Sequence, residues 1–403
     1  MKTTAVALAP NLQSQYSGAT TTGGVTMASP FRADHVGSLL RPPELLQART
    51  DFAEGRITAE ALRELTDAAV LRALEMQQQA GVSVFSDGEY RRPAWSAAVR
   101  ESVEGLVPDA EPPTVRILGQ WQGPYGELAT ASAIPGAGQV AGARLRQVRR
   151  LAGEDAAFLR QQAPGPWKIT MPGPLSAAGG LYKPGITDKV YRGRAEFVQD
   201  IVAMLQREVR ALAAEGCSYV QLDSLHYVER ITDPTVRARM EAEGKDPATY
   251  LRDLIAADNQ VLEVAQSTGM TVAMHMCRGN NRSAWHAEGS YEPIAEQAFS
   301  QLKVHRFLLE YDTERAGGFE PLRFMPRDKL VVLGLISSKE PALESIDALR
   351  RRIDEAAKYL PLENLAISPQ CGFASTQWGN LLTWDEQRRK LELVAETARK
   401  VWG

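Results

Sequence analysis

Short apolar runs alternate with amphipathic stretches along most of the chain. Residues 192–215 carry apolar side chains at helical spacing, a glycine follows, and the apolar run 219–223 comes next. Residues 247–267, another glycine and the run 271–277 repeat the same order. A helix that ends at a glycine and leads into a short apolar strand is typical of repeated βα units. This pattern predicts a parallel sheet with helices packed against it.

Eight apolar runs are candidate strands of that sheet. They cover residues 31–37, 82–88, 167–172, 219–224, 271–277, 306–311, 330–336 and 365–370. Amphipathic stretches separate most of them; one begins after Thr58 as its N-cap and ends at Gly81, and the last covers about 383–401. The count predicts a (β/α)8 TIM barrel of the α/β class, in which catalytic residues lie at the carboxyl ends of the strands. A doubly wound sheet is the alternative fold.

Two stretches do not fit the repeat. Residues 1–28 are rich in Thr, Ser, Gly and Gln and carry one charge, which predicts a disordered leader. Residues 97–162 contain Gly, Pro and the alternating run 114–118, which predicts an insertion after the second strand, built as a hairpin plus a helix. We therefore expect residues 29–403 to form a single barrel domain.

Composition and charge narrow the class of protein. Of the 403 residues 44% are hydrophobic and 24% are charged, the balance of a globular protein with a sizeable core. The net charge is −3 and no long basic run occurs, so we expect no nucleic-acid partner. No apolar stretch approaches the roughly 20 residues that span a bilayer, so we expect no membrane partner. Three cysteines do not make a disulfide framework, which favours a reducing, cytoplasmic setting.

Three of the predicted strands end in residues that bind soft metal ions. The fifth strand delivers His275 and Cys277, which face the same way because alternate strand residues share a side. Glu310 lies at the end of the sixth strand and Cys371 at the end of the eighth. Thiolate and imidazole are ligands that zinc prefers. We therefore expect one Zn2+ site assembled from these strand ends, and a plain core role for the third cysteine, Cys217.

The spacing and charge of the four ligands indicate the chemistry of such a site. Structural zinc ribbons use two close pairs of ligands, whereas only His275 and Cys277 are close here. Two thiolates, one carboxylate and Zn2+ leave a net charge of 2 − 3 = −1. Such a zinc ion is a poor Lewis acid for water but suits an incoming thiol held as thiolate. A non-catalytic barrel that binds zinc or thiols is the alternative from another class.

From about residue 31 onwards the chain resembles the catalytic barrel of cobalamin-independent methionine synthase. The resemblance is closest to short single-barrel relatives, which include epoxyalkane:coenzyme M transferase. It is carried by the motif 275–277 (His-Met-Cys), by Glu310 followed by Arg315, and by the motif 368–372 (Ser-Pro-Gln-Cys-Gly). The resemblance implies that the four residues named above bind catalytic zinc and that the protein activates a thiol for alkyl transfer.

The same resemblance implies contacts for the amino-acid part of homocysteine. Ser38 would bind its carboxylate, and Glu89 and Asp223 would bind its ammonium group. The family has Glu-Pro after the acid of the fourth strand, whereas Asp223 is followed here by Ser-Leu-His. His226 would replace the missing acid, which makes Asp223 and His226 the candidate catalytic residues; packing is the alternative for His226. His35 is also expected to be a packing residue.

The donor half of the reaction departs from the family. The synthases end the seventh strand with a histidine that serves the folate donor, whereas this chain has the sequence Ser-Ser-Lys at 337–339. Trp121 and Tyr125 of the predicted insertion are candidates to line a donor pocket, with core packing as the alternative. His286 and His305 are expected to be surface or helix residues.

These observations predict a zinc-dependent methyltransferase that makes methionine from homocysteine with a non-folate or unknown methyl donor. Its partners would be a small-molecule thiol and an alkyl donor. The alternative within the enzyme class is alkyl transfer from an epoxide or other electrophile to another thiol, such as coenzyme M. Its sulfonate would require a converging arginine cluster, for which Arg91, Arg92 and Arg278 are the candidates.

Overall fold

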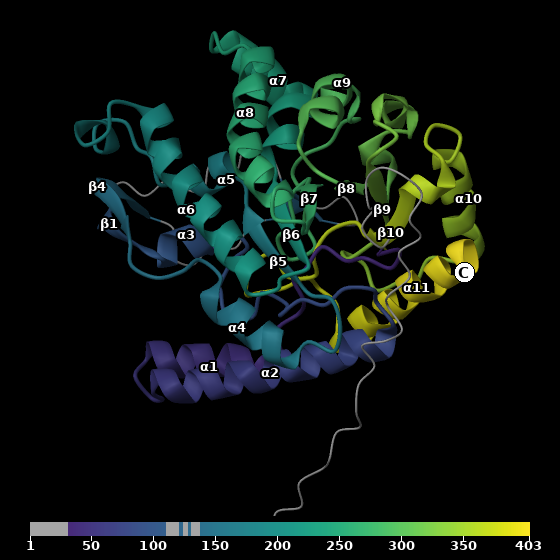
Figure 1. The fold of residues 1–403 in the computed structure, drawn as a ribbon, viewed down its shortest axis with the longest axis horizontal. Coiled ribbons are helices and arrows are strands. Elements are labelled where there is room, and N and C mark those ends of the chain that lie inside the picture. The colour runs from purple at the N-terminus through teal and green to yellow at the C-terminus, as the bar shows by residue number, and fades with distance from the viewer. Residues whose placement is uncertain (1–30, 110–120, 124–127, 130–137) are drawn as a thin grey trace, which may run out of the picture.

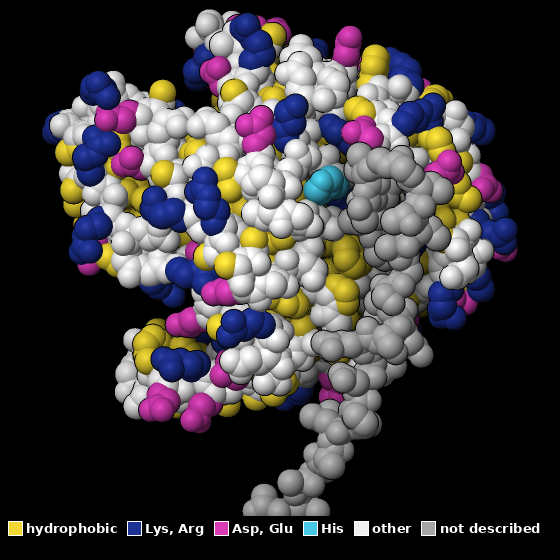
Figure 2. Space-filling model, in the orientation of Figure 1, with side chains coloured by type: hydrophobic (Ala, Val, Ile, Leu, Met, Phe, Trp, Pro, Cys, Tyr) yellow, Lys and Arg dark blue, Asp and Glu magenta, His cyan; other side chains and the backbone are white. Residues whose placement is uncertain are grey.

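The computed structural model describes residues 31–403 apart from 110–120, 124–127 and 130–137 (Figure 1). The predicted leader and the run 114–118 lie outside the described residues. Lys and Arg side chains are interspersed with Asp and Glu over the face that Figure 2 shows. None of the helices in the described ranges is long and apolar enough to cross a membrane.

A six-stranded parallel sheet forms the centre of the molecule (Figure 1). Its neighbouring strands follow chain order: β5 (Lys168–Pro172), β6 (Tyr219–Ser224), β7 (Thr271–Met276), β8 (Arg306–Glu310), β9 (Leu330–Ile336) and β10 (Leu365–Pro369). Every residue of these strands is buried. Parallel strands that are covered on both sides read as continuous apolar runs, which is why the sequence predicts them well.

Two further segments extend this sheet at its edges. Ala33 bridges Ile367 of β10 in parallel, and Phe85 bridges Trp167 next to β5. The backbone N–H of Ser83 also donates to the carbonyl of Ala33 at 2.8 Å, so the two segments contact each other. The result is an α/β fold of the TIM-barrel type.

The prediction of full strands at 31–37 and 82–88 is wrong, because each segment forms only a single bridge to the sheet. Side chains here bind backbone donors that a ladder would otherwise use. The hydroxyl of Ser83 accepts from the N–H of Ala33 at 3.1 Å, and Asp34 accepts from the N–H of His35 at 2.8 Å. Such local bonds compete with strand pairing.

Helices surround the sheet, as Figure 1 shows. They are α1 (Pro43–Ala53), α2 (Ala59–Ala80), α3 (Ala97–Glu101), α4 (Gly153–Gln162), α5 (Pro174–Ala178), α6 (Arg194–Ala214), α7 (Pro234–Ala242), α8 (Pro247–Gln266), α9 (Glu292–Gln301), α10 (Ile346–Ala356) and α11 (Trp384–Trp402). Short 3-10 turns lie at Thr187–Lys189, Glu314–Ala316, Glu320–Phe324 and Leu362–Asn364. The predicted ends of α2 are confirmed: the Thr58 side chain accepts from the N–H of Ala61, and Gly81 stops the helix at φ 82°.

Between residue 88 and β5 the chain leaves the sheet. β1 (Val103–Pro108) pairs antiparallel with β4 (Gln139–Gln147), and β2 (Trp121–Gln122) pairs with β3 (Leu128–Ala129). Gln122 and Trp285 exchange backbone hydrogen bonds of 2.8 and 2.9 Å. Because Trp285 lies in the loop after β7, this bridge holds β2 over the carboxyl ends of the strands.

Candidate active site

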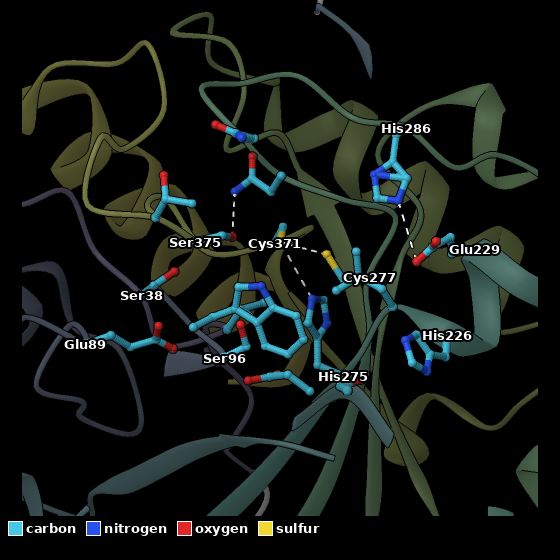
Figure 3. Close-up of a pocket in the computed structure, with 18 of the residues that line it drawn as sticks. Ser38, Glu89, Ser96, His226, Glu229, His275, Cys277, His286, Cys371 and Ser375 are labelled. Atoms are coloured by element: carbon cyan, nitrogen blue, oxygen red, sulfur yellow. Dashed lines mark hydrogen bonds and ion pairs between the residues drawn. The ribbon is translucent and has the colours of Figure 1, made fainter. Parts of the chain in front are cut away.

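The ends of three strands bring the four predicted ligands together. His275, Cys277, Glu310 and Cys371 are buried, and each offers one ligand atom within 4.8 Å of the others. The sulfur atoms of Cys277 and Cys371 lie 3.4 Å apart, and Nε2 of His275 lies 3.7 Å from the Cys371 sulfur (Figure 3). Two sulfurs, one imidazole nitrogen and one carboxylate oxygen at these separations fit the tetrahedral coordination of Zn2+.

Hydrogen bonds with neighbouring groups determine where the protons of His275, Cys277 and Cys371 lie, and so which atoms can bind a metal ion. Nδ1 of His275 lies 3.2 Å from the carbonyl oxygen of Leu308, which can only accept, so Nδ1 carries a proton and Nε2, which faces the Cys371 sulfur, is the atom placed to bind a metal ion. The N–H of Gly279 donates to the sulfur of Cys277 at 3.3 Å. The hydrogen bond between the two thiols lowers the pKa of Cys371 and raises that of Cys277, so Cys371 is the first of the pair to ionise.

Glu310 lies among cations. Its carboxylate accepts from the backbone N–H of Arg278 at 2.7 Å and from the Arg315 guanidinium at 3.3 Å. Burial opposes its ionisation, but Arg315 and Lys339 outweigh burial and hold the pKa of this carboxyl below its ordinary value. The carboxylate is therefore available as an anionic ligand.

The cluster forms part of the wall of a cavity of about 240 Å³. His275, Cys277 and Cys371 line it between two groups of side chains (Figure 3). Ser38 and Glu89 lie on one side of them, whereas His226, Glu229 and His286 lie on the other. The predicted ligands therefore lie between two halves of the cavity, the half that contains Ser38 and the opposite half that contains His286.

The half that contains Ser38 offers carboxylates. One oxygen of Glu89 accepts from Thr170 at 2.7 Å and from Arg92 at 2.8 Å, while the other is buried without a hydrogen-bond partner among the described residues. Glu89 has φ 63°, which is strained for a residue other than glycine and often accompanies a functional role. A buried, unpaired carboxylate oxygen in a cavity wall is suited to bind a cationic group of a ligand.

Asp223 lines the same cavity at the end of β6. Its Oδ1 accepts from the amide of Gln221 at 2.7 Å, and Gln221 in turn accepts from Lys168 at 3.0 Å. Burial raises the pKa of the Asp223 carboxyl to about 7, and the charge of Glu89 adds to the effect. A cation bound beside it would favour its ionised form.

The opposite half consists of rings and one carboxylate. His226 follows β6, and Glu229 lies in the π-helical turn Tyr227–Thr232. Nε2 of His286 lies 3.8 Å from Oε2 of Glu229, and the His286 ring meets the Trp121 ring edge-on at a centroid distance of 4.5 Å. Single π-helical turns are rare in proteins, and those that occur often lie at functional sites.

Both imidazoles of this half are neutral near pH 7. Burial lowers the pKa of His226 to about 3 and that of His286 to about 4. Nδ1 of His226 is paired with the hydroxyl of Tyr250 at 3.0 Å. Nδ1 of His286 and Nε1 of Trp121 are buried without a partner among the described residues. Burial also raises the pKa of the Glu229 carboxyl.

The structure brings most of the predicted site residues to one cavity. Those that line it are Ser38, Glu89, Asp223, His226, His275, Cys277 and Cys371, and Glu310 joins the last three as a candidate ligand. Trp121 also lines the cavity, whereas Tyr125 lies outside the described residues.

The prediction for His286 needs correction, because this residue lies in neither a helix nor a strand. His286 is not at the surface: its side chain is 7% exposed and it lines the cavity from the loop after β7. No periodicity marks such a loop, so the sequence holds no local signal for it. His305 is half-buried in the loop before β8, where Nδ1 accepts from the N–H of Val272 at 3.0 Å. His35 packs as predicted, with Nε2 3.0 Å from the carbonyl of Val84.

The sequence analysis missed Glu229 and Trp95, which also line the cavity. Asp223, His226 and Glu229 follow one another at intervals of three residues, a spacing that places side chains on one side of a helical turn. That spacing is the signal that could have identified Glu229. Trp95 follows the segment 82–88 in an irregular stretch, without a comparable signal.

The three arginines considered for a sulfonate site are engaged elsewhere, and none of them lines the cavity. Arg91 pairs with Asp67 at 2.8 Å. Arg92 pairs with Glu89, and the Arg278 guanidinium lies over the Tyr291 ring at 4.6 Å. They form no converging cluster in the described part of the cavity wall.

Comparisons with known proteins agree with this fold. Residues 184–400 match the family model of the cobalamin-independent synthase catalytic domain. The protein YxjG of Bacillus subtilis is 37% identical over 377 residues, which cover 93% of this chain and 95% of YxjG. A methionine synthase of Pyrococcus furiosus is 22% identical over 342 residues, 84% of each chain. A solved structure from Listeria monocytogenes, described as a candidate vitamin-B12 independent methionine synthase, is 28% identical with a TM-score of 0.67 and covers 93% of this chain and 99% of that one.

The fold and the position of the cavity define a protein of the TIM-barrel type with its site at the carboxyl ends of the strands. Within that class the chain belongs to the family of the cobalamin-independent synthase catalytic domain.

Proposed function

We propose that the protein is a zinc-dependent methyltransferase that transfers a methyl group to the thiol of homocysteine and forms methionine. The observation that carries this proposal is the meeting of His275, Cys277, Glu310 and Cys371 beside a half-cavity that offers two carboxylates. The methionine synthase of Pyrococcus furiosus, similar over 84% of this chain, supports the same reaction.

The residues fit zinc by the chemistry of their donor atoms. His275, Cys277 and Cys371 would be its firm ligands, and Glu310 the one most easily displaced. Bound zinc keeps a thiol deprotonated near neutral pH. The chain itself binds and orients the acceptor: Ser38 binds the carboxylate of homocysteine, while Glu89 and Asp223 bind its ammonium group.

The charge of the cavity supports homocysteine over coenzyme M. Among its described lining residues, three are carboxylic acids, Glu89, Asp223 and Glu229, and none is Lys or Arg. Carboxylates attract an ammonium group and repel a sulfonate, more strongly in a partly dry site than in water. A barrel that only stores metal would have no use for the unpaired oxygen of Glu89.

We also infer that the eight parallel segments close into one barrel over residues 29–403, with 97–162 as an insertion after the second segment. The contact between Ser83 and Ala33 supports the closure. The antiparallel pair β1–β4 and helix α4 support the insertion. A closed barrel would fix the strand ends rigidly, which suits a ligand set drawn from three of them.

Zinc K-edge X-ray absorption of the purified, zinc-loaded chain tests this function. Addition of homocysteine should add one sulfur neighbour to the zinc, because the thiol replaces Glu310. Addition of methionine, which has no thiol, is the control and should add none. An unchanged sulfur count with saturating homocysteine would contradict thiol activation at this site. Formation of methionine from homocysteine and a methyl donor completes the test.

A further inference from the structure

The half of the cavity that faces away from Ser38 has a chemistry of its own. Trp121, His226 and His286 line this half together with the carboxylate of Glu229. The Arg230 guanidinium lies 3.5 Å from one Glu229 oxygen and partly balances its charge, but Arg230 does not line the cavity. Oε2 of Glu229 faces His286 at 3.8 Å, beyond hydrogen-bonding distance.

This half is therefore suited to a cation. Indole rings are the best partners for cation–π contacts, and a carboxylate adds a full unlike charge. With Glu89 and Asp223 on the other side, the described lining residues include three acids and no Lys or Arg. Donors that carry several carboxylates or phosphates would be repelled by such a wall, whereas a compact cation would be attracted.

The neutral imidazoles point to the same class of donor. A tertiary amine can give up a methyl group readily only if a proton is supplied to its nitrogen. Without that proton, the demethylated amine would have to leave as an anion. No histidine supplies this proton, because His226 and His286 lose their protons well below neutral pH and the end of β9 offers Ser337 and Ser338 instead. A sulfonium or quaternary ammonium compound needs no proton, because it becomes neutral when its methyl group leaves.

We propose that Trp121, Glu229 and His286 form the methyl-donor subsite and that the donor is a methylated onium cation, either a sulfonium or a quaternary ammonium compound. This inference rests on the proposed methyl transfer to homocysteine and names the donor class. Two polar atoms without a hydrogen-bond partner among the described residues, Nδ1 of His286 and Nε1 of Trp121, are positioned to bind polar groups of the donor.

The transfer balances without a further reactant. Homocysteine loses its thiol proton to solvent when it binds as thiolate. Its sulfur then attacks the methyl carbon, so that one sulfur–carbon bond forms as the methyl–onium bond breaks. The electron pair of the broken bond stays on the donor atom, which leaves as a neutral thioether or tertiary amine. The negative charge of the thiolate and the positive charge of the onium group cancel.

Binding is tested without the acceptor, by titrating the zinc-loaded full chain with choline and with its neutral carbon isostere, 3,3-dimethylbutan-1-ol. Choline should bind, and the isostere should bind at least roughly tenfold more weakly. Glu229→Gln, which removes the charge at nearly constant shape, should weaken choline binding roughly ten- to a hundredfold, as for the loss of one contact between unlike charges. The matched control is Glu241→Gln, an exposed residue of α7, which should bind choline as wild type does.

Transfer is tested with carbon-13-labelled homocysteine, so that methionine made from it differs in mass from methionine left by a donor, and with four deuteromethyl donors: S-methylmethionine, glycine betaine, methyltetrahydrofolate and methylcobalamin. Label should reach methionine from one of the first two, and which one distinguishes sulfonium from ammonium. Glu229→Gln and Trp121→Leu should raise the KM of that donor and leave the affinity for homocysteine unchanged. Thermal melts verify that both variants fold.

Three results would overturn the donor assignment. Equal binding of choline and its isostere would do so, as would label transfer from the folate or the corrinoid alone. Absence of label from all four donors would also overturn it. In that last case the zinc absorption experiment still decides the thiol acceptor, so a failure of the donor class is distinguishable from a failure of the proposed function.

Discussion

Asp223→Asn isolates the contact that would distinguish homocysteine from a thiol without an amino group. The side chain keeps its shape, and the new amide oxygen can still accept from Gln221, which donates to Oδ1 at 2.7 Å in the wild type. Burial already disfavours the charge of Asp223 and raises its pKa to about 7, so loss of that charge should not unfold the protein. The change removes one carboxylate from the ammonium subsite and leaves the four metal ligands intact.

The expected magnitude follows from the contact that is lost. A hydrogen bond to a charged group contributes about 1.5–3 kcal/mol. About 1.4 kcal/mol corresponds to a tenfold change in affinity. Homocysteine should therefore bind roughly ten- to a hundredfold more weakly to the variant. Glu89 remains as a second carboxylate, with one unpaired oxygen in the cavity wall, and should limit the loss to the lower part of that range.

Isothermal titration of the zinc-loaded wild type and variant measures the effect. Homocysteine is compared with 2-mercaptoethanol, which has no amino group and whose affinity should hardly change. Zinc content is determined on the same samples and should stay at one ion per chain. Asp253→Asn is the matched control, because Asp253 lies on the exposed side of α8. Indifference of homocysteine to Asp223→Asn would refute the ammonium contact. Tighter binding of coenzyme M than of homocysteine to the wild type would refute the choice of acceptor.

Further predictions concern the metal, the donor and stability. Cys277→Ser and Cys371→Ser should each lose zinc in elemental analysis yet remain folded, whereas Cys217→Ser, away from the cluster, should retain it. Glu310→Ala should retain much of its zinc with weaker affinity; a variant as metal-free as Cys371→Ser would make Glu310 a structural ligand. Methyltetrahydrofolate should support turnover well below about 1 s⁻¹, because β9 ends without a histidine to protonate the leaving nitrogen. Burial raises the pKa of Asp258 to about 7 in the folded protein, whereas the pKa of an Asp in the unfolded chain is about 4. The protonated carboxyl therefore stabilises the fold fully below about pH 4, and this stabilisation is lost as the pH rises through 7. Asp258→Asn should therefore raise Tm at pH 8 and have much less effect at pH 5.

The sequence predicts the sheet well where burial alone decides the structure. The six strands from β5 to β10 are buried on both sides, and their apolar runs match the strands to within one or two residues. The segments 31–37 and 82–88 carry polar side chains, such as Asp34 and Ser83, that bind backbone groups directly. Hydrophobic patterning cannot detect this competition, which depends on contacts between residues about 50 positions apart.

The sequence likewise predicts the strand-end residues of the site better than those that reach the cavity from other segments. The four candidate ligands lie at strand ends or directly after them, and the parallel direction of the strands places such positions at one edge of the sheet. His286 and Trp121 approach the cavity from outside the parallel sheet, one from the loop after β7 and one from the short strand β2. Their proximity depends on the backbone bridge between Gln122 and Trp285, which no local pattern in the sequence indicates.

The two halves of the cavity therefore differ in how firmly the fold holds them. The half that contains Ser38 would bind the thiol acceptor and is called the acceptor half, and the half that contains His286 would bind the methyl donor and is called the donor half. In the acceptor half, Asp223 lies in β6 and is linked through Gln221 to Lys168 of β5, and Ser38 and Glu89 follow the two segments that bridge the sheet at its edges. The donor half is built on a π-helical turn, the loop after β7 and the short strand β2, and its His286 ring packs against the Trp121 ring. Rigid elements hold side chains more accurately than loops do. Substitutions in the donor half should consequently alter which donor is used, while substitutions at the strand ends should alter whether a thiol is bound at all.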